Sequence, residues 1–508
     1  MFVSSIAIDR WITRRRRRPS RRPDPHPPPP PSISRVADFR YMATSDLLAE
    51  LSKESFRATA DVEKKVCGVV LRQLDDASGD VASLAVKCLP PLVKGASPAA
   101  AADVVDGLCA KLATIGKDAA AQRDVAVIGL KTIVAELGYH ASASRIVSSL
   151  APKLIERVVA VPSSSGANDA KPSNAANDVS GECLDILHAV VCSYGTIMTS
   201  RHADLVDALL RAMDDASTAK RRAGRKRAAA CLAALAGSVD DALLGTIADA
   251  ATSRLDALGP DAIARCASAS ACDDARLCAH LLGASAKSAG ARFGATLRRV
   301  DATRRVVELA RAASEEHAEA LREQCLTTLE MFASRCPAET AEDLPAVVEL
   351  ALTMASYDPN YADDDDDDDG GAMDVDGGDD AMDDGDGSDD DDGSDDGSDD
   401  ESDDDQYSDD EDASWKVRRA AVKLLSAAVA GPSPSSAAVL ESHFERVKRT
   451  LLSRLPRERE ETVKMDVYAC LEDVVGACGP RRAASASLAA TATEVRSYTG
   501  SHTTPSAW

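Results

Sequence analysis

One cluster of cysteine and histidine residues resembles a metal site, in the stretch "CASASACDDARLCAH". It consists of Cys266, Cys272, Cys278 and His280, so that consecutive cysteines stand six residues apart. Structural zinc sites place paired cysteines about two to four residues apart. On a helix, a separation of six residues rotates consecutive side chains by about 240°. The spacing therefore favours cysteines packed in a core beside a surface histidine, and we expect no metal site.

The sequence contains none of the common catalytic or nucleotide-binding signatures. Its eight histidines occur without HxxxH or HExxH, and the chain lacks GxSxG, GxGxxG and GxxxxGK[ST]. Serine and cysteine are plentiful, but no pattern places a base and an orienting group beside them. We therefore expect a protein that is not an enzyme and that carries no cofactor.

A tract of aspartate follows "YDPNY" at Tyr357 and continues to Asp412. A calcium loop of the EF-hand type needs regularly spaced ligands, a Glu at the twelfth position and flanking helices, which "DVDGGDDAMDDGDGS" lacks. The tract could attract a basic partner such as a histone tail, but screening over about 8 Å makes it a steering surface, with no specific pocket. The simplest interpretation is a disordered acidic loop over residues 358–412, because insertions into a helical scaffold cost little.

Serines inside this tract are each followed by acidic residues, the pattern that acidophilic kinases prefer. Phosphorylation is therefore a hypothesis that mass spectrometry of protein from cells would test. The candidate residues are Ser388, Ser394, Ser398, Ser402 and Ser408.

A second charged stretch, "RRAGRKR", covers Arg221–Arg227. Seven consecutive helical residues go most of the way round the helix, and no aromatic side chains alternate with them to stack on bases. The stretch therefore indicates a basic helix face, or a contact for an acidic protein partner, and we expect no specific nucleic-acid binding.

Composition favours helices over sheets. The chain of 508 residues is 44% hydrophobic but only 3% aromatic, so its core must use Leu, Val, Ile and Ala. The net charge of −24 is concentrated, because residues 363–412 hold 30 acids and no Lys or Arg, which leaves +6 for the rest. The Arg/Pro-rich residues 1–37 alone carry a net +7 (9 Arg, 2 Asp), so the remaining body is near −1. We expect residues 1–37 to be disordered.

Cysteine usage and hydropathy indicate the cellular compartment in which the protein is expected. Thirteen cysteines without a CxxC pair favour a reducing environment. No apolar run approaches the roughly 18 residues of a membrane span, and we expect no membrane partner. At the N-terminus an apolar stretch precedes the arginines, the wrong order for a secretory signal, which leaves a transit peptide or a nuclear import patch. We expect the cytoplasm and the nucleus.

A repeating pattern of about 45 residues runs through the chain. An acid stands five residues before an apolar residue that is often followed by a basic one, as in Asp76 before Val81 and Glu458 before Val463. Asp412 and Glu316 repeat this spacing, and Asp215 opens a related stretch. The helices that follow carry equivalent apolar positions near Leu89, Ile133, Leu187, Leu232, Leu425 and Leu471.

This pattern is typical of stacked helical repeats. An acid just before a helix can accept hydrogen bonds from free N–H groups, and the basic residue one turn later can pair with an acid of the neighbouring repeat. The sequence therefore predicts an all-α fold, a HEAT-repeat α-solenoid. We expect repeats over residues 38–357 and 413–479, and a low-complexity tail over 480–508.

Several stretches together resemble the N-terminal part of the cullin-associated, neddylation-dissociated proteins, a family also described as interacting with the TATA-binding protein. These stretches are "DFRYMATSDLLAEL", "LAVKCLPPLV", "IGLKTIVAEL", "SWKVRRAAVKLL" and "REREETVKMDV", together with "YDPNY" before the acidic tract. The resemblance runs from Asp38 to about Gly479, and YDPNY, acidic tract and SWKVRRAA in succession are its most specific part.

The resemblance implies a HEAT superhelix that wraps a cullin–RING scaffold. It implies binding to the cullin C-terminal domain and its RING-box protein, through the concave face of the second helices. Family members bind cullins that lack the ubiquitin-like modifier and help to exchange substrate receptors in SCF assembly, without catalysis. Lys416, Arg418 and Arg419 are candidate contacts because they follow the acidic tract, but Arg418 also fits the repeat's basic position, which favours a structural role for it.

The chain also departs from the family. The Arg/Pro segment replaces the family's first helix, and the match stops after Gly479, without the adaptor-competing end. We expect a truncated gene prediction or one half of a protein encoded in two pieces, so a separate C-terminal half is a further candidate partner. The alternative functions are a HEAT-type nuclear transport receptor and a metal-dependent regulator.

Overall fold

The computed structural model describes residues 33–53, 56–114, 119–159, 174–214, 219–259, 269–313, 318–359, 413–431 and 433–478. All the regular elements in these ranges are helices. In the same ranges, no helix is long and apolar enough to cross a membrane. The predicted all-α class is confirmed.

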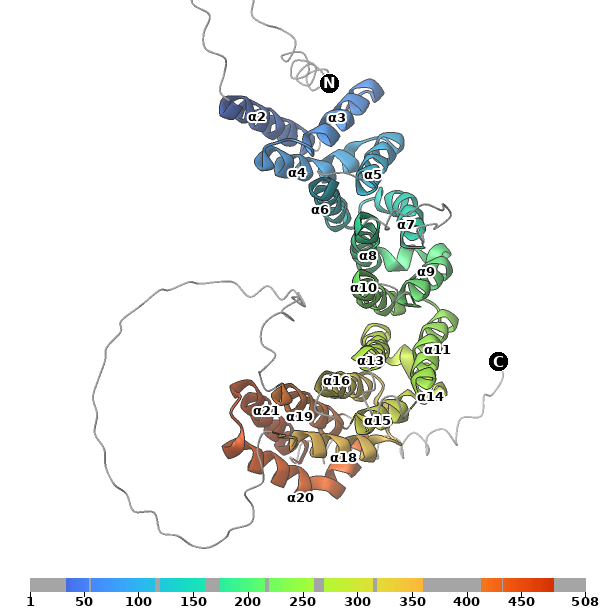
Figure 1. Cartoon of the computed structure of the whole chain (residues 1–508), viewed down its shortest axis with the longest axis vertical. Helices are drawn as coiled ribbons and strands as arrows, with labels where there is room; N and C mark the ends of the chain where they lie inside the picture. The colour runs from blue at the N-terminus through green and yellow to red at the C-terminus, as the bar shows by residue number, and fades with distance from the viewer. Residues whose placement is uncertain are drawn as a thin grey trace, which may run out of the picture.

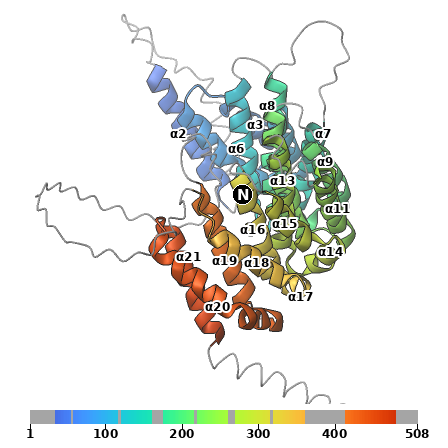
Figure 2. The ribbon, with the colours of Figure 1, turned by 60° about the horizontal axis from the view of Figure 1, so that its bottom comes forward.

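The helices form two rows that bend into an arc (Figures 1 and 2). The inner row consists of α2 (Ile33–Leu51), α4 (Gly79–Gly95), α6 (Ala119–Leu137), α8 (Asn174–Tyr194), α10 (Ala219–Ala236), α13 (Ala269–Ala289), α16 (Glu319–Arg335), α19 (Ser414–Ala430) and α21 (Glu461–Cys478). The outer row consists of α3 (Ala60–Gln73), α5 (Pro98–Leu112), α7 (Ala143–Val159), α9 (His202–Asp214), α11 (Asp241–Leu258), α14 (Phe293–Arg299), α15 (Ala302–Ala312), α18 (Leu344–Ala355) and α20 (Pro434–Arg457). A short helix, α17 (Pro337–Thr340), joins α16 to α18.

Each inner helix from α4 to α19 packs on the inner helices before and after it and on the outer helix that precedes it in the chain and forms a repeat with it. This is the connectivity of a HEAT-type solenoid, in which each repeat contacts only its neighbours. The predicted architecture is therefore confirmed.

Local sequence signals start the outer helices. The hydroxyl of Ser97 accepts a hydrogen bond from the N–H of Ala100 at 3.4 Å, and Pro98 occupies the first turn of α5. Ser433 plays the same part for α20, which begins at Pro434. Proline fits the first turn because its missing N–H would have no partner within the helix.

Both rows of helices supply the core. The repeat positions predicted to be apolar are buried, with Leu471 partly buried at the last of them. Five cysteines of the inner helices are also buried; they are Cys88, Cys183, Cys231, Cys325 and Cys470. Burial raises the pKa of the Cys88 thiol to about 12, so this cysteine stays protonated and unreactive at neutral pH.

The predicted pairing between neighbouring repeats is confirmed at two acids. Asp76, which precedes α4, accepts hydrogen bonds from Arg40 of α2 at 2.7 and 2.8 Å and from the N–H of Ser78 at 3.0 Å. Glu458, which precedes α21, accepts bonds from Arg418 of α19 at 2.8 and 2.9 Å. Two further pairs were not predicted, Arg123–Glu182 at 3.3 Å and Arg225–Asp274 at 2.5 Å. The remaining predicted acids lie outside the described residues; they are Asp215, Glu316 and Asp412.

Two predicted boundaries are wrong by a few residues. Helix α2 begins at Ile33, so residues 33–37 belong to the helical unit and not to the N-terminal extension. Asp358 was assigned to the acidic loop, but its carboxylate bonds Arg454 of α20 at 2.8 Å. The rest of the extension and residues 360–412 lie outside the described residues, and their disorder stays a prediction. Residues 479–508, which include the predicted low-complexity tail, also lie outside them.

Glycine permits one close approach between inner helices. A Cβ added to Gly283 of α13 would lie 3.0 Å from the Cα of Thr328 in α16, too close for a methyl group beside a backbone atom. We therefore expect Gly283→Ala to cost about 1–3 kcal/mol of stability through overpacking. The matched control is Gly68→Ala in α3, where no atom lies within 4 Å. This control should stabilise by up to about 1 kcal/mol through helix propensity. Thermal unfolding followed by circular dichroism measures both, and an unchanged midpoint for Gly283→Ala would refute the close packing.

Candidate partner-binding surface

The exposed side of the inner row, here called the inner face, lines the inside of the arc (Figure 1). Five of its helices each present an exposed lysine; these are Lys87, Lys131, Lys226, Lys287 and Lys423. Their ammonium groups offer hydrogen-bond donors and positive charge to the carboxylates of a large partner. The sequence did not identify these five lysines, because exposed lysines of the inner and outer rows look alike in a linear pattern.

Some acidic side chains on the inner face are engaged by neighbouring helices. Arg227 of α10 pairs with Asp185 of α8 at 3.2 Å, and Arg419 of α19 pairs with Asp466 of α21 at 2.9 Å. Burial raises the pKa of Glu330 in α16, against the opposing effect of Lys423 and Lys287. These contacts neutralise some of the acids locally, whereas Asp124, Glu136 and Asp273 of the inner helices are exposed like the lysines.

A buried ionic network closes the base of the acidic insertion. Arg418 bonds Glu458 in the next repeat, the Ser414 hydroxyl at 2.6 Å and the carbonyl oxygen of Tyr357 at 3.2 Å. Arg454 of α20 bonds the same Glu458 at 2.7 Å and Asp358 at 2.8 Å. Residues on both sides of the insertion thus meet at two arginines and two carboxylates.

The network strongly favours the charged form of Glu458. Burial alone would raise the pKa of its carboxyl group, but the bonds from Arg418 and Arg454 and from the N–H of Glu460 lower it to about 2. The side chains of Arg418 and Glu458 are only 3% and 0% exposed. Charge-assisted bonds at such sites hold geometry firmly, since neither charge can be solvated if the other is removed.

Tyr357 extends this network toward the preceding repeat. The guanidinium of Arg322 in α16 lies 4.7 Å from the centre of the Tyr357 ring, a cation–π contact. Arg322 also donates to the carbonyl oxygen of Ala313 at 2.5 Å, just after α15. Residues 357–359 therefore act as a folded anchor whose Tyr and Asp contact three repeats.

The three predicted contact residues have different surroundings. Arg418 is buried in the network, so the structural role favoured by the repeat pattern describes it and its side chain does not reach the surface. Lys416 is exposed, with its ammonium 5.8 Å from the Trp415 ring. Arg419 is 40% exposed and bound to Asp466. Contacts of Lys416 and Arg419 with a partner stay a prediction.

Other sequence candidates are not brought together into a site. The five serines lie outside the described residues, as does Cys266. Cys278 is buried and Cys272 is half-buried, and among the described residues no three His, Cys, Asp or Glu side chains could hold a metal ion. In the stretch "RRAGRKR", Arg225 is buried and bonds both Asp274 and the carbonyl oxygen of Met213. This basic stretch is thus partly a packing element.

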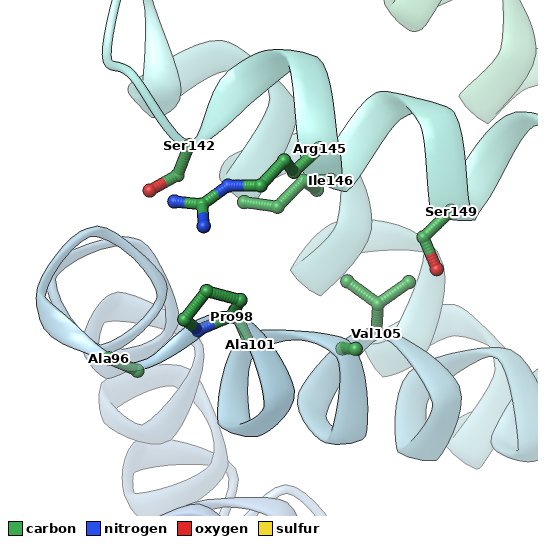
Figure 3. A pocket seen from close by; sticks show the side chains of 9 residues that line it. Ala96, Pro98, Ala101, Val105, Ser142, Arg145, Ile146 and Ser149 are labelled. Carbon is green, nitrogen blue, oxygen red and sulfur yellow. The ribbon is translucent and has the colours of Figure 1, made fainter.

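A shallow hollow lies on the outer row, between α5 and α7 (Figure 3). Pro98 and Val105 of α5 line one side, Ile146 of α7 lines the other, and Arg145 extends across it. Its volume is about 30 Å³, whereas pockets for small molecules measure about 300–1,000 Å³. The hollow is therefore too small for a substrate.

The buried network predicts a strong effect of Glu458→Gln. Removing this charge leaves the two buried arginines, Arg418 and Arg454, with Asp358 as their one remaining carboxylate among the described residues, which should cost about 3–5 kcal/mol. The pKa of Glu458 is lowered from 4.5 to about 2, so the wild-type advantage is complete above the higher value and is lost as the pH falls toward the lower one. Urea unfolding and hydrogen exchange of α19–α21, at pH 7 and across that window, measure this. Glu441→Gln, an exposed position on α20, is the control; equal effects of the two substitutions would contradict the network's role.

Comparison with known proteins identifies relatives of the chain. No protein-family model matches it. It is 36% identical over 442 residues to Cullin-associated NEDD8-dissociated protein 1 of Arabidopsis thaliana, covering 87% of this chain and 31% of the relative. It is 37% identical over 431 residues to Cullin-associated NEDD8-dissociated protein 2 of Mus musculus, covering 85% and 30%.

The chain therefore spans about 30% of the length of these relatives, in their N-terminal portion. A crystal structure of importin beta is similar over 90% of this chain and 50% of that protein, with a TM-score of 0.52 and 12% identity. At that identity the likeness concerns the solenoid fold alone. The resemblance expected from the sequence is confirmed.

Proposed function

Because the chain is homologous to the N-terminal portion of the cullin-associated NEDD8-dissociated proteins, we propose that it is a non-catalytic regulator of cullin–RING ubiquitin ligases. The observation that carries this proposal is the sequence identity of 36–37% over more than four fifths of the chain to relatives named for cullin association. The chain would bind the unmodified cullin–RING scaffold, with the cullin C-terminal domain and its RING-box protein as partners.

The geometry supports a protein partner held along the inner face. The arc offers an extended concave surface of the kind that solenoids use for large ligands (Figure 1). Exposed lysines spaced along it would meet acidic side chains of the partner, which favours fast association and correct alignment more than raw affinity. The buried network at Arg418 would hold α18, α19 and α21 in one geometry while the partner binds.

The part played in substrate-receptor exchange is the finer step of the proposal. The matched stretch covers less than a third of the relatives, so we assign to this chain the task of holding the scaffold during SCF assembly. We place this activity in the cytoplasm and the nucleus, where the serines of the acidic tract would be available to acidophilic kinases.

A HEAT-type nuclear transport receptor remains the alternative considered from the sequence. The importin beta likeness is a likeness of fold and adds nothing to that alternative. Pull-down with the small transport GTPase and with a cullin separates the two: recovery of the GTPase without the cullin would replace the present proposal.

Binding to a purified cullin C-terminal domain in complex with its RING-box protein tests the proposal quantitatively. We expect binding of the unmodified complex and at least tenfold weaker binding of the NEDD8-modified one. Reversing two inner-face charges, with Lys287→Glu and Lys423→Glu together, should weaken binding at least tenfold and reduce its salt dependence, because attractive charges are replaced by repulsive ones.

The matched control is Lys65→Glu, an exposed lysine on outer helix α3, which should bind like the wild type. Isothermal titration calorimetry at two salt concentrations measures all three proteins. An inner-face variant that binds as tightly as the control would place the partner elsewhere on the solenoid.

A further inference from the structure

The inner face carries an exposed thiol beside an imidazole. Cys192 lies near the end of α8 and is exposed, and His188 stands four residues before it and is partly exposed. Residues four apart on a helix lie on the same face, one turn above the other. The Sγ atom of Cys192 therefore lies 3.6 Å from Nε2 of His188 and 4.0 Å from its Nδ1.

This separation suits two ligands of one zinc ion. A tetrahedral zinc ion holds sulfur at about 2.3 Å and nitrogen at about 2.1 Å, which sets these two ligand atoms about 3.6 Å apart. The Sγ and Nε2 atoms have this separation, and rotation of the imidazole ring aims a nitrogen lone pair at an ion bound to the sulfur. Two ligands on one helix act as a chelate, because the second is held at a high effective concentration once the first has bound.

The surroundings keep the imidazole in the form that binds metals. Burial lowers the pKa of His188, and Lys131 of α6 lowers it further, against the opposing effect of Asp185. The ring is therefore neutral at pH 7, and a nitrogen lone pair is available to a metal ion. Burial raises the pKa of the Cys192 thiol. The ion must therefore displace the thiol proton, which passes to solvent as the thiolate binds.

Exposure and a neighbouring imidazole distinguish Cys192 from the other cysteines of the described residues. Cys88 and Cys231 are buried, and the thiol of each donates to a backbone carbonyl oxygen of a neighbouring inner helix. Cys478 is exposed at the end of α21, but α21 contains no histidine. Within the described ranges no third His, Cys, Asp or Glu joins His188 and Cys192 in a metal-binding group. A metal ion at this pair therefore keeps coordination positions for other ligands.

We propose that His188 and Cys192 form a two-ligand site for Zn²⁺ on the inner face, with the remaining coordination positions taken by water. One thiolate and one imidazole select zinc over magnesium and calcium, which prefer oxygen ligands. The open positions of the ion face the inside of the arc, where a carboxylate of a bound protein would replace a water molecule. The site is made by residues of this chain and is independent of the cullin contact.

Calorimetric titration of the reduced, metal-free full chain with Zn²⁺ tests the site. We expect about one equivalent to bind with a Kd of about 1–100 μM, because two ligands supply roughly half the binding free energy of a four-ligand site. Titrations in two buffers of different ionisation enthalpy count the protons released. The count should be close to one at pH 7, since only the thiol carries a proton to lose.

Two substitutions locate the ion. Cys192→Ser and His188→Gln should each weaken Zn²⁺ binding at least tenfold, because each leaves a single ligand and removes the chelate. Both lie on the exposed side of α8, and thermal unfolding followed by circular dichroism verifies that each variant folds. Cd²⁺ is the spectroscopic probe, since its charge-transfer absorption with a thiolate should appear in the wild type and be lost in Cys192→Ser.

The matched control is Cys478→Ser, which removes an exposed thiol without an imidazole on its helix and should bind Zn²⁺ like the wild type. Absence of Zn²⁺ binding by the wild type would overturn the proposal. Full affinity in His188→Gln would identify an isolated thiol as the ligand, and a tenfold loss in Cys478→Ser would place the ion elsewhere; either result would also overturn it.

Discussion

The fold of the C-terminal half depends on the buried bond between Arg418 and Glu458. Arg418 also bonds the carbonyl oxygen of Tyr357 before the acidic insertion and the hydroxyl of Ser414 after it. One guanidinium thus closes the ends of the insertion and joins two consecutive repeats. The entropic cost of closing a loop increases only slowly with the length of the loop. A few strong bonds at its base therefore suffice to keep the helices on either side in register. This explains how a solenoid can accept a run of acids that carries more charge than the rest of the chain.

The same type of bond recurs along the inner row. Arg40, Arg123 and Arg225 each pair with an acid of the following repeat. We call each of these ion pairs between consecutive repeats, with the apolar contacts around it, a junction. Because repeats contact only their neighbours, the free energy of unfolding is close to a sum of the contributions of the junctions and of the single repeats. A junction therefore fixes the position of one repeat on the next without involving the exposed inner face.

More of the fold than of the candidate binding surface could be predicted from the sequence. Periodic apolar residues and the acids at Asp76 and Glu458 identified the repeats, since both signals depend on spacing along one helix. The pairs of Arg123 and Arg225 were missed because their partners, Glu182 and Asp274, lie inside the next helix and not before it. The inner-face lysines were also missed, because only packing decides which side of a helix meets solvent. Similarly, Arg418 and Arg419 are neighbours in sequence, yet one is buried and the other half-exposed.

This separation of buried junctions from exposed faces has a consequence for function. Substitutions on the inner face change what a partner meets but leave the junctions intact, and surface substitutions of this kind usually alter stability by less than about 0.5 kcal/mol. The same position of the repeat need not have the same surroundings in every helix. Tyr468 and Val475 of α21, the last helix that the structure describes, stand 46 residues after Val422 and Val429 of α19, and the first two are exposed whereas the two valines are buried. Whether a side chain at this position belongs to the core is therefore decided by the neighbouring repeat that covers it, because each repeat contacts only its neighbours.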